Sequence, residues 1–432
     1  MMELAIIGLL FLGTLLALYA AGMPVAVAMG LTCLVIMVSP YGDGINYGLI
    51  STQLLFGLNS FTLLAIPFYL LLGRLMNHIG MTQRIFRFAG ALVGQFRGGI
   101  AQVNVLASMI FSGMSGLALA DAAGLGRVEY RAMRDHGYDK GISLGVSGSS
   151  AIIGPIIPPS VPIIIYAVLA EESIGELFLA GIVPGLLLGL LLMALVYALV
   201  VRREYDAREP FDPEELKESF IGAAAAILTP LIIVLGILSG YFTATEAGAV
   251  SVVYVILVGI AYGELTAGGL YRELRDSAVE TFSLTFIVAV AALYGLIALQ
   301  LQLPTLLAEG IGAVTTDPVG ALLLIVLLLL VVGTFMETIA AITILVPILL
   351  PVIELTGIDP VHFGIVMILT LMLGLLTPPF GVILFVLEKV TDASLEEVMY
   401  AVIPFYLPIL VVLLLVVLFP GLATYVPGLM PG

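Results

Sequence analysis

The 432-residue chain is 61% hydrophobic and only 10% charged, with a net charge of −15 at pH 7. Apolar runs of this density exceed what a soluble core needs, and they lack the alternation of a membrane β-barrel, so both classes are excluded. The acidic balance disfavours nucleic-acid binding, and a single cysteine, Cys33, excludes disulfides and thiolate metal sites. We therefore expect an all-α polytopic membrane protein embedded in a lipid bilayer.

In the first half, taken as residues 1–219, simple crossings precede a hairpin and a broken helix. The apolar stretch 98–126 has basic residues on both flanks, so it must enter and leave from one side as a re-entrant hairpin. The predicted elements are helices near 4–20, 24–38 and 61–77, the hairpin near 98–126, a broken crossing near 142–170 and a helix near 177–200.

The second half, taken as residues 220–432, repeats this order. Its predicted elements are helices near 220–238, 246–263 and 281–300, a hairpin near 319–354, a broken crossing near 361–387 and a last helix near 400–418. The first half makes five full crossings, an odd number, so the second half starts from the opposite side of the membrane. We therefore predict two inverted repeats.

The basic residues predict the orientation. The chain has 15 Lys and Arg residues. None of them falls in the loops near 39–60, 170–176, 239–245, 302–318 and 355–361, or in the tail that follows Phe419. The positive-inside rule places the basic loops in the cytoplasm and both chain termini outside.

A block that occurs twice, 220 residues apart, marks the two helix breaks. It reads G-P-I-I-P-P-S-V from Gly154 to Val161 and G-L-L-T-P-P-F-G from Gly374 to Gly381. Proline pairs inside long apolar runs interrupt helices at membrane depth, and the freed backbone groups must bind something. Two matched breaks in corresponding halves indicate the binding site of a transporter.

Glycines and hydroxyl residues around the breaks predict a cation site in each half, because unwound backbone exposes carbonyl oxygens as hard ligands. The alternative is that these small residues only let helices pack closely. The copies differ, since Ser160 matches Phe380 and Ser115 matches Phe335, so we expect two related ion sites of unequal strength. The ligand candidates are Ser112, Gly113, Ser115, Gly154, Pro155 and Pro158 in the first half, and Gly333, Thr334, Thr338, Gly374, Thr377 and Pro378 in the second.

Further polar and break residues are candidates for substrate contact or coupling. Two are acids in apolar hairpins, Asp121 and Glu337, where a carboxylate is costly and function is the default hypothesis. The alternative for Asp121 is a helix cap near 122–124. The remaining candidates of this kind are Ser147, Ser149, Ser150, Pro159, Ser160 and Pro379.

Helix-capping patterns predict several boundaries. Ser173 with Glu176 and Ser394 with Glu397 have capping-box spacing, and Asp212 precedes Pro213 as an N-cap in the linker between the halves. No nucleotide-binding or catalytic motif stands in a credible context, so we expect neither a nucleotide cofactor nor enzymatic activity. An ion gradient must then supply the energy.

These motifs resemble the large membrane subunit of the tripartite ATP-independent periplasmic (TRAP) transporters, the DctM family of the ion transporter superfamily. The resemblance covers essentially the whole chain. It is most specific in S-G-M-S-G-L-A-L-A-D-A-A-G-L-G from Ser112 to Gly126, in G-P-I-I-P-P-S-V-P from Gly154 to Pro162, and in Gly374 to Gly381. Leu117 stands where many relatives have another small polar residue, which weakens the side-chain part of the first site.

The resemblance implies sodium-coupled uptake of an organic acid by an elevator mechanism in a bacterial or archaeal cytoplasmic (inner) membrane. A transport domain with both hairpins and both broken helices would slide against a scaffold of the other helices. It also implies a small four-helix membrane subunit and a periplasmic substrate-binding protein. Because the chain starts directly with its first predicted helix, we expect the small subunit to be a separate chain.

Alternatives remain at this stage. One is a stand-alone Na⁺-coupled carrier or Na⁺/H⁺ exchanger of the same superfamily; an intramembrane enzyme and a passive channel are others. The substrate stays open among dicarboxylates, sialic acids, keto acids, aromatic acids and compatible solutes such as ectoine. No membrane arginine stands out as a carboxylate clamp, so we expect helix N-termini to contact the anion.

Overall fold

The structure, a computed structural model, describes residues 2–42, 47–203, 205 and 210–430, and the side chains of residues 2–5, 42 and 112–115 lie outside that description. No strand occurs in the described residues. Helices of the first half are α1 (Met2–Ala20), α2 (Val25–Val38), α3 (Gly48–Leu58), α4 (Ala65–His78), α5 (Met81–Val93), α6 (Gly99–Ser115), α7 (Ala118–Ala123), α8 (Leu125–Asp135), α9 (Lys140–Ala151), α10 (Val161–Ala170) and α11 (Ile174–Arg202), with short 3-10 turns η1 (Pro40–Gly42) and η2 (Phe61–Leu64).

Helices of the second half are α12 (Pro213–Leu238), α13 (Ala244–Ala261), α14 (Ala267–Gln300), α15 (Leu303–Gly312), α16 (Pro318–Phe335), α17 (Thr338–Leu355), α18 (Pro360–Leu376), α19 (Val382–Val390), α20 (Leu395–Val402), α21 (Tyr406–Leu418) and α22 (Gly421–Thr424), with 3-10 turns η3 (Ile403–Phe405) and η4 (Pro427–Leu429). Seven helical stretches of the described chain are long and apolar enough to cross a membrane: α11, α12, α13, α14, α16, α17 and the α20–α21 stretch. The number rises to eight if α3 and η2–α4, bent by 54° at their junction, form one span. The all-α polytopic membrane class is confirmed, while the inverted relation of the halves and the orientation of the termini stay predictions.

Several predicted loops are helical. The stretch 39–60 contains α3, which packs against α14, and the stretch 302–318 contains α15, which packs against α17. Helix α5 buries Ile85, Phe88 and Val93 on one face and is therefore amphipathic. The sequence had predicted only a basic loop in this stretch. The linker helix and the crossing near 220–238 are one helix, α12, and α14 begins well before residue 281.

The predicted helix caps are confirmed, except that one predicted capping box is incomplete. The Asp212 carboxylate accepts hydrogen bonds from the backbone N–H groups of residues 214 and 215, and Ser394 with Glu397 forms a complete capping box. Ser173 accepts from the Glu176 N–H, but within the described residues the Ser173 N–H does not donate to the Glu176 carboxylate, so only half of that capping box is formed. A third box, complete, joins Thr243 and Glu246 at the start of α13.

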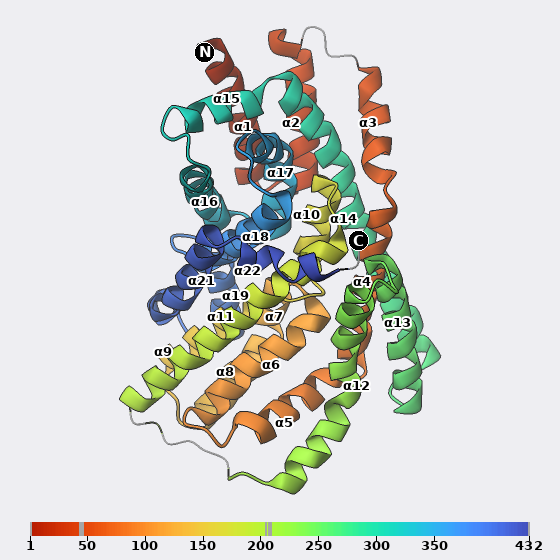
Figure 1. The fold of residues 1–432 in the computed structure, drawn as a ribbon, viewed down its shortest axis with the longest axis vertical. Helices are drawn as coiled ribbons and strands as arrows, with labels where there is room; N and C mark the ends of the chain where they lie inside the picture. Colours follow the sequence, from red (N-terminus) through yellow and green to blue (C-terminus); the bar gives the residue numbers. More distant parts are fainter. Residues whose placement is uncertain (1, 43–46, 204, 206–209, 431–432) are drawn as a thin grey trace.

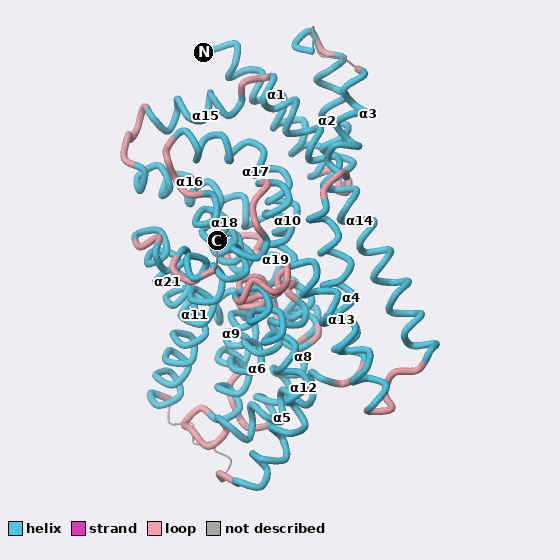
Figure 2. Tube along the Cα trace, turned by 45° about the vertical axis from the view of Figure 1, so that its right-hand side comes forward, coloured by secondary structure: helices cyan, strands magenta, loops and turns pink. Residues whose placement is uncertain are grey.

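Two sets of helix contacts organise the fold, and they meet where α14 packs against α17 and α5 against α6. In one, α14 lies against α2, α3 and α4, while α13 lies against α4 and α12. In the other, elements of the two halves interleave: α9 packs against α20, α7 against α19 and α10 against α17. Within the second half, α16 packs against α18. Figure 1 shows α1, α2, α3 and α15 at the end that holds the N-terminus, with α5 and the start of α12 at the opposite end. Loop segments lie in the interior at mid-height, near α9, α18 and α19 (Figure 2).

Candidate functional site

Both double-proline blocks interrupt their helices. Helix α9 ends at Ala151 and α10 begins at Val161, while α18 ends at Leu376 and α19 begins at Val382. Each break holds a cis peptide bond, between Pro158 and Pro159 and between Pro378 and Pro379. The two breaks therefore share local geometry as well as sequence.

The tip of the first hairpin lies directly on the first break. Gly116 ends α6 with φ of 59°, and a Cβ at this position would lie 2.8 Å from the Pro159 carbonyl oxygen and 3.0 Å from the Ser160 Cα. Only glycine satisfies both the left-handed conformation and the close approach. The candidates Ser112, Gly113 and Ser115 lie in the last turns of α6, and their side chains are outside the described part of the chain.

The second hairpin contacts the second break in the same way. A Cβ on Gly374 would lie 2.6 Å from both the Cα and the carbonyl carbon of Gly333, so the two backbones touch without a side chain between them. The N–H of Gly381 donates to the Thr334 carbonyl oxygen at 2.8 Å. The Thr334 hydroxyl donates to the carbonyl of residue 331 at 2.8 Å, and the Thr377 hydroxyl donates to that of residue 373 at 2.7 Å. Both hydroxyls thus bond helix carbonyls and keep lone pairs available.

Between the two hairpin tips lies a cavity of about 320 Å³. Three of the helices around it contribute residues from their first turns: α7 with Ala118, α10 with Pro162, and α17 with Thr338 and Ile339. None of its lining residues in the described part of the chain is basic. These lining residues are Leu117, Ala118, Leu119, Ala120, Pro155, Pro162, Glu337, Thr338, Ile339 and Leu375. Partial positive charge at helix starts favours an anionic group in such a space.

The two hairpin acids have different settings. Glu337 is the N-cap of α17, and its Oε2 accepts from the N–H groups of Ile339 at 2.9 Å and Ala340 at 3.3 Å. Asp121 is buried within α7, whose N-cap is Leu117, so it is not the cap of that helix. Its Oδ2 lies against the first break, 2.6 Å from where a Cβ on Gly154 would stand.

The serine candidates fall into two sets. At the break, the Ser160 hydroxyl donates to the Pro155 carbonyl at 2.6 Å and accepts from the Ile163 N–H, which caps α10. Earlier on α9, the Ser149 hydroxyl donates to the carbonyl of residue 145 at 2.7 Å. Within the described chain, the buried hydroxyls of Ser147 and Thr338 have no hydrogen-bond partner. These two orphaned hydroxyls are available to an ion, a water molecule or a substrate.

One buried acid escaped sequence reasoning. Glu129 of α8 is 1% exposed, and its two carboxylate oxygens accept from the hydroxyl of Ser108 on α6 at 3.2 Å and of Ser150 on α9 at 3.4 Å. A signal existed, because Glu129 shares the apolar face of α8 with Leu125 and Met133, four residues to either side. Glu129 thus connects three helices behind the first break.

Comparison with known proteins now places the chain in a family. The family model described as "Tripartite ATP-independent periplasmic transporter, DctM component" matches residues 12–422. The chain is 44% identical to the sialic acid TRAP transporter large permease protein SiaM of Vibrio cholerae, covering 96% of this chain and 97% of SiaM. It is 41% identical to the sialic acid TRAP transporter permease protein SiaT of Haemophilus influenzae, over 88% of this chain and 62% of SiaT.

A solved structure has the same fold. The Alcanivorax borkumensis YdaH transporter superposes with a TM-score of 0.63 at 18% identity, covering 89% of this chain and 90% of YdaH. A sequence identity of 18% supports a shared fold and nothing further. The motifs at both breaks, the helical membrane architecture and the family match over nearly the whole chain agree: this protein belongs to the DctM family, the large permease subunits of TRAP transporters.

Proposed function

We propose that the chain imports a small organic anion in symport with sodium, together with a small membrane subunit and a periplasmic binding protein. The observation that carries the proposal is the convergence of two hairpin tips on two helix breaks around one cavity of about 320 Å³. Broken helices at matched positions expose carbonyl oxygens to a cation, and helix starts face an anion. The cavity thereby offers complementary groups for both solutes.

We propose two sodium sites, one at each helix break. In the first, backbone oxygens of the Gly154–Pro158 segment would surround the ion, and Ser112 and Ser115 are the ligand candidates that the sequence adds. In the second, the tight approach of Gly333 and Gly374 brings the oxygens of the second break near those of Thr334 and Thr377. Thr338, with its unpartnered hydroxyl on the cavity, would contact substrate or ion.

The substrate class is supported by the relatives. Their names specify sialic acid, isethionate, 2,3-diketo-L-gulonate and C4-dicarboxylate, each of which carries a carboxylate or sulfonate. We infer an acid of this kind, held at the starts of α7 and α10, because the Glu337 carboxylate already caps α17. The SiaT and DctMQ relatives extend beyond the matched part, with 62% and 64% of their length covered.

The elevator mechanism is supported by the packing. Helices α6 to α11 and α16 to α22 form one interleaved group that carries both hairpins and both breaks. The other group, centred on α14 with α2, α3, α4 and α13, would be the fixed scaffold. Substrate would cross by movement of the first group as a body.

The test is uptake into liposomes that contain this chain with its small subunit. We expect accumulation of the substrate only when both an inward sodium gradient and the binding protein encoded nearby are present. Uptake by this chain alone, indifferent to the binding protein, would favour the stand-alone carrier. Accumulation that ignores the sodium gradient would remove the coupling proposal. Glu337→Gln, which keeps an acceptor for the α17 cap, should preserve the sodium response.

A further inference from the structure

A basic pocket of about 480 Å³ lies where the second arm of the first hairpin meets the end of α19. Helix α8 forms one wall, residues 389–392 form the other, and α8 packs against α19. Among the described residues, the pocket shares no lining residue with the central cavity. Its charged lining residues are Arg127, Arg131, Arg134, Lys389, Asp135 and Asp392. Four are basic and two are acidic, so the pocket has an excess of two positive charges (4 − 2).

The three arginines share one face of α8. They stand at positions 127, 131 and 134, so successive turns of the helix present them to the pocket. All three are exposed, as is Lys389 in the last turn of α19. Leu125 and Met133 are buried on the inward face of α8, which fixes the arginine face outward.

These cations have no acidic partner. Within the described chain, the side chains of Arg127, Arg131 and Lys389 form no ion pair and no hydrogen bond. The Arg134 Nη1 donates to the backbone carbonyl of Tyr138 at 2.5 Å. That acceptor is neutral, so it fixes the guanidinium group without cancelling its charge.

The two acids of the pocket do not neutralise the four cations. Both carboxylate oxygens of Asp392 have other partners: Oδ1 accepts a hydrogen bond from the Tyr130 hydroxyl, and Oδ2 lies 3.7 Å from the Lys140 Nζ on α9. Asp135, exposed at the end of α8, forms no ion pair in the part of the chain that the structure describes. Counting both acids in full still leaves the excess of two positive charges.

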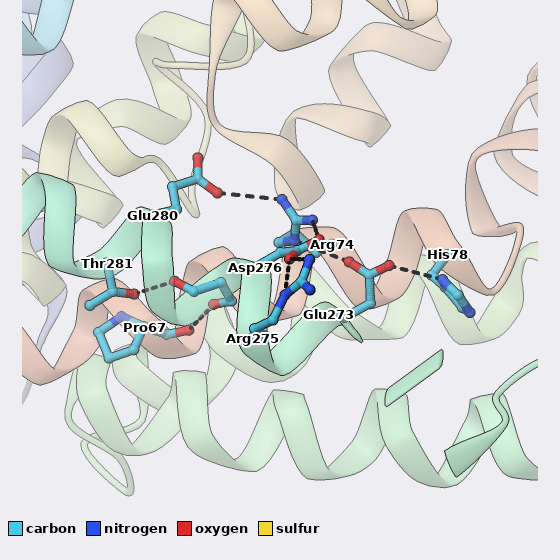
Figure 3. A network of polar contacts seen from close by, with 9 residues as sticks. Pro67, Arg74, His78, Glu273, Arg275, Asp276, Glu280 and Thr281 are labelled. Carbon is cyan, nitrogen blue, oxygen red and sulfur yellow. Dashed lines mark hydrogen bonds and ion pairs between the residues drawn. The ribbon is translucent and has the colours of Figure 1, made fainter. Parts of the chain in front are cut away.

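Arg74 shows the opposite situation on the other group of helices. Its guanidinium group lies within 3.0 to 3.6 Å of Glu273, Asp276 and Glu280 on α14 (Figure 3). Three acids surround one cation there, so that site has no charge left for an anion. The pocket beside α8 differs because its arginines face open space.

The charge and the donor geometry favour a terminal phosphate group. A phosphate monoester carries about −1.5 to −2 charges at pH 7 and three strong acceptor oxygens, which matches the excess of the pocket. A carboxylate or a phosphodiester carries one negative charge. Guanidinium groups bind phosphate oxygens in a bidentate manner, and clusters of basic residues at the cytoplasmic surface of membrane proteins bind anionic head groups.

We propose that this pocket binds the dianionic phosphate of a phosphate monoester, which the three arginines of α8 and Lys389 of α19 contact together. Two sources carry this chemistry, a free phosphorylated compound and phosphatidic acid of the membrane. Bound phosphate would tie α8 of the first half to the end of α19 of the second half. The proposal goes beyond the proposed function and does not rest on it.

The test is a binding measurement on the purified chain with its small subunit, in an uncharged, phosphate-free detergent. Isothermal titration calorimetry compares glycerol 3-phosphate with dimethyl phosphate, a monoanionic diester, at equal ionic strength. Native mass spectrometry compares the retention of phosphatidic acid and of phosphatidylglycerol. The pocket variants are Arg127→Gln, Arg131→Gln and Arg131→Lys. Arg97→Gln is the matched control, because Arg97 is exposed, lies outside the pocket and forms no ion pair in the described chain.

We expect the monoester to bind roughly tenfold more tightly than the diester, because its second charge meets unpaired cations. Arg127→Gln and Arg131→Gln should each weaken monoester binding roughly tenfold, since each removes a charge-assisted hydrogen bond. Arg131→Lys should be intermediate, because it keeps the charge and loses the fork. The melting temperature, which checks folding, should not change in these variants. Binding of glycerol 3-phosphate would assign a free ligand, and retention of phosphatidic acid without it would assign a lipid.

Equal binding of monoester and diester in both arms would reduce the pocket to a non-selective basic surface and overturn the proposal. Absence of monoester binding in both arms would overturn it too. The same holds if the pocket variants bind like wild type, or if Arg97→Gln weakens binding as much as they do. Because no ion gradient is involved, a failure of sodium-coupled uptake leaves these results untouched.

Discussion

Replacing Gly374 by alanine tests whether the second hairpin must seat on the second break for sodium to bind. The added Cβ would stand 2.6 Å from two backbone atoms of Gly333, whereas ordinary contact begins at 3.4 Å. The backbones must therefore separate by 0.8 Å (3.4 − 2.6). Overpacking of this kind costs on the order of 1–3 kcal/mol. If this cost falls on the sodium-bound state and not on the sodium-free state, the sodium concentration for half-maximal uptake should rise roughly 5- to 150-fold.

The assay is sodium-dependent uptake into liposomes, with the melting temperature as the check on folding. Gly222→Ala on α12 is the matched control, because its Cβ would meet no atom within 4 Å. Gly333→Ala should be intermediate, since its Cβ would lie 3.2 Å from the Gly374 Cα. A Gly374→Ala protein with the sodium dependence of Gly222→Ala would show that the hairpin contact does not shape an ion site.

Three further predictions follow from single contacts. Thr377→Ala should raise the sodium concentration for half-maximal uptake; an unchanged sodium curve would show that its hydroxyl serves only the helix carbonyl of residue 373. Glu129→Ala should destabilise the protein by roughly 1–3 kcal/mol in thermal denaturation, because it removes the acceptor of two buried serine hydroxyls, whereas Glu129→Gln should stay close to wild type. The hydrogen bond from Tyr130 holds the pKa of Asp392 below its ordinary value of 3.8, so its stabilisation is complete above that pH and disappears as the pH falls through the lower folded value. The melting temperatures of Tyr130→Phe and wild type should therefore differ at neutral pH and converge in acid; a constant gap would contradict the assignment.

Local chemistry explains what the sequence could predict. Proline has no N–H and clashes with the preceding turn, so the pairs Pro158-Pro159 and Pro378-Pro379 each interrupt a helix. The capping residues Asp212 and Ser394 act on N–H groups two or three positions away, and both were found where predicted. The position of Glu337 near the middle of 319–354 likewise marked a hairpin tip.

Tertiary contacts decided what was missed. The stretches of α3 and α15 carry no charge pattern of a crossing, and their helical state is supported by packing against α14 and α17. Glu129 looked like one of several charged residues in a basic segment, and its burial depends on α6 and α9 closing over it. The central cavity joins Leu117 to Glu337 across 220 residues (337 − 117), a proximity with no local signal.

Because helices of the two halves pack against each other, some helices are synthesised long before their packing partners. Helix α9 ends at Ala151 and its packing partner α20 begins at Leu395, so 244 residues (395 − 151) separate them. At translation rates of roughly 5–20 residues per second, the ribosome takes on the order of 10–50 s to reach α20 after completing α9. Helices α7 and α10 are likewise synthesised well before their packing partners, α19 and α17. The first break, its serines and its hairpin are thus synthesised early but enclosed only after the second half has been made.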